Sequence, residues 1–132
     1  MAIIHTVRIR SRSILVITSH PLTALRMRAG LKALPNCNVS FVFDREEAFH
    51  LAWQDHPDLL ILDYCATGVN GFKLVKVFKR LYPEAAIIAL TTGGTNGSQQ
   101  QVAELCAGRV LEKPVDPAEL YRLALATLTT IT

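Results

Sequence analysis

Three side chains that together could bind a phosphoryl group each stand at or just after the end of a short apolar run: Asp63, Thr91 and Lys113. A carboxylate can carry a phosphoryl group as an acyl phosphate, a hydroxyl can donate to one of its oxygens, and an ammonium can neutralise another. Thr18 and Ser19 occupy the corresponding place after another apolar run. These five residues form one site if the apolar runs are strands of one parallel sheet.

Five short runs rich in apolar and β-branched residues indicate buried strands. They cover residues 13–18, 39–43, 59–63, 86–91 and 109–112. A helical pattern follows each run, beginning at Pro21, after Asp44, after Gly71, at Ser98 and at Pro117. Asp44 with Glu47 predicts a capping box, and Asp116 precedes a first-turn proline. In the first helix the apolar spacing depends on Leu22 and Leu25, among others.

Strands that alternate with helices imply a parallel sheet with right-handed crossovers and helices on both faces. We therefore predict an α/β fold, a three-layer sandwich of a five-stranded parallel sheet and five helices. The carboxyl ends of such strands meet at one edge of the sheet. We expect the five strand-end residues to lie together at this edge.

The composition indicates one compact domain, which we assign to residues 13–130 after an N-terminal extension at residues 1–12. The 132 residues are 50% hydrophobic and 19% charged, which argues against disorder. The net charge of +3 is weaker than expected for a dedicated nucleic-acid binder. No apolar stretch approaches the roughly 18 residues of a membrane span. Three cysteines, at 37, 65 and 106, suit no disulfide framework or zinc site and favour a reduced, cytoplasmic setting.

Other features that could do chemistry are weaker. The glycine-rich segment 93–97 invites a nucleotide-binding hypothesis, but it matches neither common phosphate-binding motif. We expect His20 to be a loop residue beside a helix cap and Cys65 to have no role in the site. The basic side of the third helix is interpreted as a solvated face; it consists of Lys73, Lys76, Lys79 and Arg80.

The apolar strand that ends at Asp63, the glycine eight residues later, the Leu90-Thr91 pair and the Lys113-Pro114 dipeptide follow one another in a definite order. In this order and approximate separation they resemble the receiver domain of two-component response regulators. The resemblance covers about residues 13–128.

The resemblance implies a flavodoxin-like fold, with Asp63 as phosphoacceptor, Thr91 as switch hydroxyl and Lys113 as the lysine that pairs with phosphate. It also implies a sensor kinase or another signalling protein as partner. The segments 19–22 and 90–92 look most like the branch that carries a LuxR-type helix-turn-helix.

Three features depart from the family pattern. Receivers hold Mg²⁺ with two acidic residues directly after the first strand, where this sequence has Thr18 and Ser19. Mg²⁺ prefers carboxylates to hydroxyls. Thr67 replaces the family's proline four residues after the aspartate, and Val110 replaces the switch aromatic three residues before the lysine.

These departures predict an atypical receiver, or pseudo-receiver, in which phosphorylation at Asp63 is weak or absent. We expect Asp63 and Lys113 to form a standing ion pair. No cofactor is expected; Mg²⁺ would bind, weakly and through Asp63, only if phosphorylation is retained. The alternative is a functional phosphoacceptor receiver with Mg²⁺-dependent aspartyl phosphorylation in a phosphorelay.

The family resemblance also implies where partners bind. Dimer mates and partners of receivers use the face of the fourth helix, fifth strand and fifth helix, which is about residues 98–127 here. We predict a homodimer through this face, with five apolar or aromatic residues available for packing: Val102, Leu105, Val110, Tyr121 and Leu125. We expect a signalling module and not an enzyme, without direct contact to nucleic acid or membrane.

Overall fold

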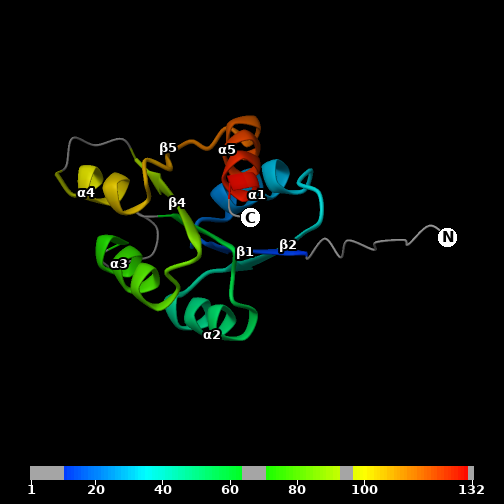
Figure 1. Ribbon diagram of the computed structural model, residues 1–132. Helices are drawn as coiled ribbons and strands as arrows, with labels where there is room; N and C mark the ends of the chain where they lie inside the picture. The colour runs from blue at the N-terminus through cyan, green and yellow to red at the C-terminus, as the bar shows by residue number, and fades with distance from the viewer. Residues whose placement is uncertain (1–10, 64–70, 93–96, 131–132) are drawn as a thin grey trace.

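The computed structural model describes residues 11–63, 71–92 and 97–130, in which five strands alternate with five helices (Figure 1). The elements are β1 (Arg12–Ile17), α1 (Pro21–Leu31), β2 (Cys37–Val42), α2 (Arg45–Asp55), β3 (Leu59–Asp63), α3 (Gly71–Leu81), β4 (Ala86–Thr91), α4 (Gly97–Leu105), β5 (Val110–Glu112) and α5 (Pro117–Thr130). All strand pairs are parallel, in the order β2-β1-β3-β4-β5. The predicted α/β fold is confirmed, and the sheet is that of a flavodoxin-like domain.

The central strand β3 is buried along its whole length, as its uninterrupted apolar sequence predicts. It pairs with β1 on one side and β4 on the other. Leu62 stands opposite Ile17, and Asp63 stands opposite Leu90. The register therefore brings the residue after Ile17, which is Thr18, to the level of Asp63.

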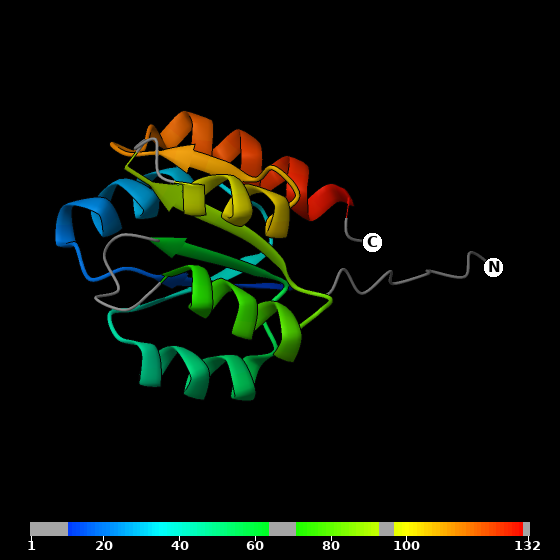
Figure 2. The ribbon, with the colours of Figure 1, turned by 90° about the vertical axis from the view of Figure 1, so that its left-hand side faces the viewer.

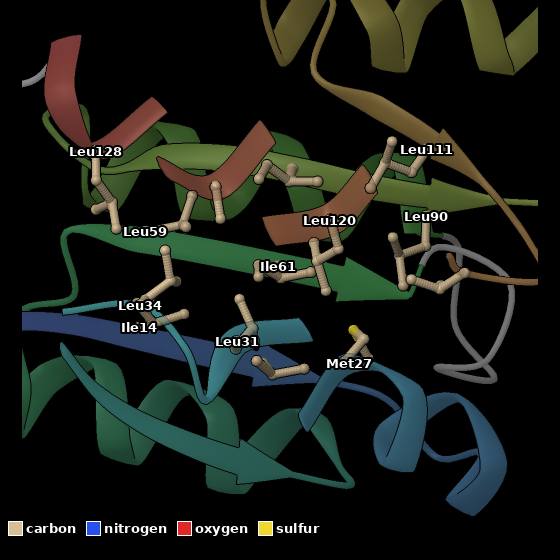
Figure 3. Close-up of a cluster of buried hydrophobic side chains, with 14 of the residues drawn as sticks. Ile14, Met27, Leu31, Leu34, Leu59, Ile61, Leu90, Leu111, Leu120 and Leu128 are labelled. Carbon is tan, nitrogen blue, oxygen red and sulfur yellow. The ribbon is translucent and has the colours of Figure 1, made fainter. Parts of the chain in front are cut away.

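Each face of the sheet has its own hydrophobic core. Figure 1 shows α1 and α5 together on one face and α2 with α3 on the other. The first core joins alternate strand residues to α1 and α5, and Figure 3 shows this core with Ile14, Met27 and Ile61 among its labelled residues. The second core joins the remaining strand residues to α2, α3 and α4 (Figure 2). Burial on both faces explains why the strand sequences do not alternate between apolar and polar residues.

Local hydrogen bonds begin two of the helices as the sequence predicts. The Asp44 carboxylate accepts from the Glu47 backbone N–H at 2.8 Å, and the Asp116 carboxylate accepts from the Ala118 N–H at 3.0 Å. Both bonds satisfy amides that have no partner within the helix. His20 stands at the N-cap of α1 but makes no side-chain cap hydrogen bond.

The apolar spacing that predicts α1 includes residues that α1 does not bury. Leu22 and Leu25 are 66% and 63% exposed, because α1 buries instead the side that carries Ala24, Met27 and Leu31. The expectation that Val102 is available to a dimer interface was wrong, because Val102 is fully buried in the second core.

Several boundaries differ from prediction by one or two residues: β1 begins at Arg12, within the expected extension, and β2 at Cys37. None of the described helices combines the length and apolar character that a membrane span requires. Cys65, Thr67 and most of the glycine-rich segment lie outside the described residues.

Cys106 is a buried cysteine. Its burial raises the pKa of the thiol to about 11, although Lys79 and Arg109 act to lower it. This thiol is therefore protonated at neutral pH.

Gly30 allows α1 to lie against the start of α5. A Cβ atom added at Gly30 would stand 2.5 Å from the carbonyl oxygen of Pro117. Because backbone atoms cannot yield as a flexible side chain does, Gly30→Ala should destabilise the domain by about 1–3 kcal/mol. Urea denaturation followed by circular dichroism measures the change.

The test is whether Gly30→Ala lowers or raises the free energy of unfolding. At an open helical site the same substitution would stabilise by about 1 kcal/mol through helix propensity. A Gly30→Ala protein as stable as the parent, or more so, would contradict the close contact between α1 and α5.

Candidate functional site

Asp63 lies at the carboxyl end of the central strand with no exposed surface. The hydroxyl of Thr18 donates a hydrogen bond of 2.8 Å to Oδ2 of Asp63. Thr18 is itself fully buried, directly after β1. The parallel register of β1 and β3 creates this contact between residues far apart in the sequence.

Lys113 supplies the positive charge for Asp63. Its Nζ atom lies 2.8 Å from Oδ1 and 2.9 Å from Oδ2 of the carboxylate, and the lysine side chain is 13% exposed. The Lys113 backbone N–H donates to the carbonyl of Thr91 at 2.7 Å, which holds the start of the β5–α5 turn against the end of β4. The ion pair predicted from the sequence is present.

His20 is a fourth member of this cluster, which the sequence analysis missed. Its Nδ1 atom lies 3.1 Å from Nζ of Lys113 and 3.6 Å from Oδ2 of Asp63, while the side chain is 53% exposed. Its backbone N–H also donates to the Thr18 hydroxyl at 3.2 Å. The only sequence signal was its place two residues after Thr18, and spacing alone does not orient an imidazole.

The other two residues that the sequence predicts for this site are Thr91 and Ser19. Thr91 is 3% exposed and contributes its backbone carbonyl to Lys113. Ser19 is exposed. The structure thus brings Asp63, Lys113 and Thr18 into direct contact, with Thr91 joined to them through the backbone.

Two residues compensate the buried charge of Asp63 through three hydrogen bonds. An ionised carboxylate without partners is very costly in a protein interior, whereas one with an opposite charge and hydrogen bonds is tolerated. Here both oxygens of Asp63 accept from Lys113, and Oδ2 also accepts from Thr18. The cluster forms an internally hydrogen-bonded unit at the edge of the sheet where this fold binds ligands.

The chain's family follows from a direct comparison. A family profile described as the response regulator receiver domain matches residues 14–124. This chain belongs to that family. The match includes Asp63, Lys113 and both neighbouring strands, so the receiver resemblance seen in the sequence is confirmed.

Individual relatives agree with this assignment. The phosphate regulon transcriptional regulatory protein PhoB of Pseudomonas aeruginosa is 35% identical over 74 residues, which are 54% of this chain and 32% of that protein. The match thus spans about a third of that relative's length.

Solved structures share the fold. A two-component transcriptional regulator AraC from Clostridium phytofermentans is 26% identical with a TM-score of 0.75, covering 92% of this chain and 94% of that chain. The isolated receiver domain of RcsB from Salmonella enterica, determined with the phosphomimetic BeF3⁻, is 25% identical with a TM-score of 0.78, covering 92% and 90%. The receiver domain of an HD domain-containing protein from Pseudomonas fluorescens reaches a TM-score of 0.81 at 24% identity, with 92% and 90% covered.

The residues around Asp63 do not fit the Mg²⁺ ion that the receiver family implies. Mg²⁺ requires hard oxygen ligands and usually one or two carboxylates. Thr18 directs its hydroxyl proton at Asp63, and both oxygens of Asp63 already accept from Lys113. Within the described ranges no three His, Cys, Asp or Glu side chains gather as metal ligands. The segments 64–70 and 93–96 contain no Asp or Glu in their sequence.

The ion pair predicts a large effect of removing the lysine alone. Lys113→Met leaves a buried carboxylate without its cation and should destabilise the domain by about 3–5 kcal/mol. Combining it with Asp63→Asn removes the uncompensated charge, so the double variant should recover a large part of this loss. Denaturant unfolding of both single variants and the double variant gives the coupling energy.

Lys32→Met serves as the control, because Lys32 is exposed at the end of α1. It should change stability by less than about 0.5 kcal/mol. A Lys113→Met protein that loses no more than this control would mean that the ion pair does not compensate Asp63.

Proposed function

We propose that this receiver domain signals as a pseudo-receiver, by protein–protein interaction, with phosphorylation at Asp63 weak or absent. The observation that carries the proposal is the state of Asp63: the side chain has no exposed surface, and both of its oxygens accept hydrogen bonds. In this state the carboxylate of Asp63 stabilises the fold and is poorly placed to attack as a nucleophile.

The chemistry of aspartyl phosphorylation supports this interpretation. The carboxylate must attack a phosphorus atom while positive charge neutralises the phosphoryl oxygens. The hydrogen bonds from Lys113 and Thr18 withdraw electron density from both oxygens of Asp63 and so lower the nucleophilicity of the carboxylate. The replacement of the acidic pair by Thr18 and Ser19 removes the ligands that would hold a metal ion to assist that step.

A pseudo-receiver of this kind needs no catalytic turnover. The cluster around Asp63 joins the ends of β1, β3 and β5, and it holds these strand ends in one arrangement without a phosphoryl group. The partner is then a sensor kinase or another signalling protein that binds the domain in this arrangement. In this proposal the domain is not an enzyme.

The alternative is a functional phosphoacceptor with Mg²⁺-dependent phosphorylation of Asp63. It is favoured by the ammonium group of Lys113, which lies where it could neutralise a phosphoryl oxygen, and by the hydroxyl-bearing Thr91 at the end of β4. The two functions differ in whether Asp63 becomes modified.

Treatment with acetyl phosphate and Mg²⁺, followed by intact-mass spectrometry, tests the proposal. The unmodified chain should acquire little phosphate, and Thr18→Asp/Ser19→Asp should bind Mg²⁺ more tightly and acquire more. Ser19→Asp alone is a second variant that spares the buried position, since Ser19 is exposed. Asp63→Asn is the control for the site of modification.

Two results would overturn the proposal. Stoichiometric phosphorylation of the parent chain that Asp63→Asn abolishes would establish the alternative function. Mg²⁺ affinity that is equal in the parent and in both aspartate variants would show that the metal argument is wrong.

We further propose that the domain forms a homodimer through the face of α4, β5 and α5, about residues 98–127. Tyr121 and Leu125 on α5 are half-buried and pack only in part against the first core. Sedimentation velocity at increasing concentration should give a dimer that Tyr121→Ala/Leu125→Ala weakens by about tenfold or more. A monomer at all concentrations up to about 1 mM would contradict this interface.

A further inference from the structure

The outer side of α3 combines cationic and exposed apolar side chains. Lys73, Lys76 and Arg80 are exposed there, and α3 has no acidic residue in its sequence. Val77 and Leu81 are 36% and 55% exposed on the same helix. Single exposed apolar residues are common on protein surfaces. Here, however, the two apolar side chains and the three cations line the same hollow.

Two hollows follow this side of the helix. The larger has a volume of about 570 Å³, and its described lining consists of Phe72, Lys73, Lys76, Val77, Arg80 and Leu81. The smaller, of about 170 Å³, lies between α2 and α3 and is lined by Arg45, Phe49, Lys73, Leu74 and Val77. Lys73 and Val77 line both hollows, so the two are neighbours. We call the residues of both linings the α3 surface.

The chemistry of the α3 surface defines its occupant. Its hollows have apolar walls, formed largely by Val77, Leu81 and Phe72, and a rim of lysine and arginine side chains. Apolar side chains of a partner can enter the hollows while carboxylates beside them meet the cations on the rim. An amphipathic helix with acidic residues next to its apolar stripe meets both requirements. We propose that the α3 surface binds an acidic amphipathic segment of a partner protein.

Two other classes of anionic partner fit less well. A lipid surface requires apolar side chains that project beyond the cationic ones, whereas Val77 lines the hollows between them. Single-stranded nucleic acid requires an open aromatic face for base stacking. The aromatic ring of Phe72 instead has the Lys76 ammonium over it, 5.2 Å from its centroid.

The α3 surface is separate from the cluster around Asp63 and from the proposed dimer face. Its side chains come from α2 and α3. Figure 2 shows these two helices together on one face of the sheet. Neither Asp63 nor Lys113 lines either hollow. Binding there needs no phosphorylation, so the proposal stands whether or not Asp63 accepts a phosphoryl group.

Binding of three fluorescein-labelled synthetic peptides to the full chain tests the proposal by fluorescence anisotropy. The first is a helix-forming peptide of about 18 residues with a leucine stripe flanked by glutamates. The second replaces its leucines by serine, and the third replaces its glutamates by lysine. Vesicles of phosphatidylserine with phosphatidylcholine, and single-stranded DNA, test the other partner classes.

Variants of the chain distinguish binding at the α3 surface from a general effect of the net charge. Lys76→Glu/Arg80→Glu reverses two cations of the α3 surface, and Val77→Ser removes an apolar wall. Arg28→Glu/Lys32→Glu changes the net charge equally at exposed positions in the last turn and at the C-cap of α1, outside both the α3 surface and the proposed dimer face. Circular dichroism and thermal unfolding verify that each variant is folded.

The first peptide should bind, and the serine and lysine peptides should bind at least about tenfold more weakly. Lys76→Glu/Arg80→Glu should weaken binding about tenfold and Val77→Ser about threefold, with the control pair within about twofold of the parent. Equal weakening by the control pair, equal binding of the serine peptide, or no binding up to about 1 mM would overturn the proposal. So would tighter binding of the vesicles or DNA that the same α3 variants abolish.

Discussion

The buried carboxylate of Asp63 is the constraint on which the arrangement of this domain depends. Its negative charge lies at the carboxyl end of the central strand, and groups from two other chain segments must reach it. The cost of burying a charge without partners exceeds the stability that a small domain can lose. The end of β1 and the turn after β5 are therefore held to the end of β3 by an electrostatic requirement as well as by the sheet. The hydrogen bond from Lys113 to the Thr91 carbonyl adds β4 to the same group.

Much of this arrangement was predictable because the signals are local and strong. Uninterrupted apolar runs identified β3 and β4, and the caps at Asp44 and Asp116 fixed two helix starts. The parallel order of strands then brought Asp63 and Lys113 to one edge, which is a property of the topology and not of side-chain detail. The ion pair followed from opposite charges at that edge.

The expectations that failed concern side-chain direction and close packing. α1 has apolar residues on more than one side, and the burial of Met27 with the contact of Gly30 against Pro117 decides which side faces the sheet. The hydrophobic periodicity of a sequence does not show where a glycine is needed to let a neighbouring backbone approach. The two hydrogen bonds of the Thr18 hydroxyl and the imidazole of His20 depend on rotamers, which a sequence does not specify.

The hydroxyl of Thr18 has a consequence for the charge balance at this end of the sheet. An aspartate in its place would bring a second carboxylate against Asp63, with Lys113 as the ammonium nearest to Asp63. Like charges this close raise the free energy of the folded state unless a cation arrives at the same time. The uncharged hydroxyl therefore leaves Lys113 with a single carboxylate to compensate, so one ammonium group is sufficient where two acidic side chains would require a further cation.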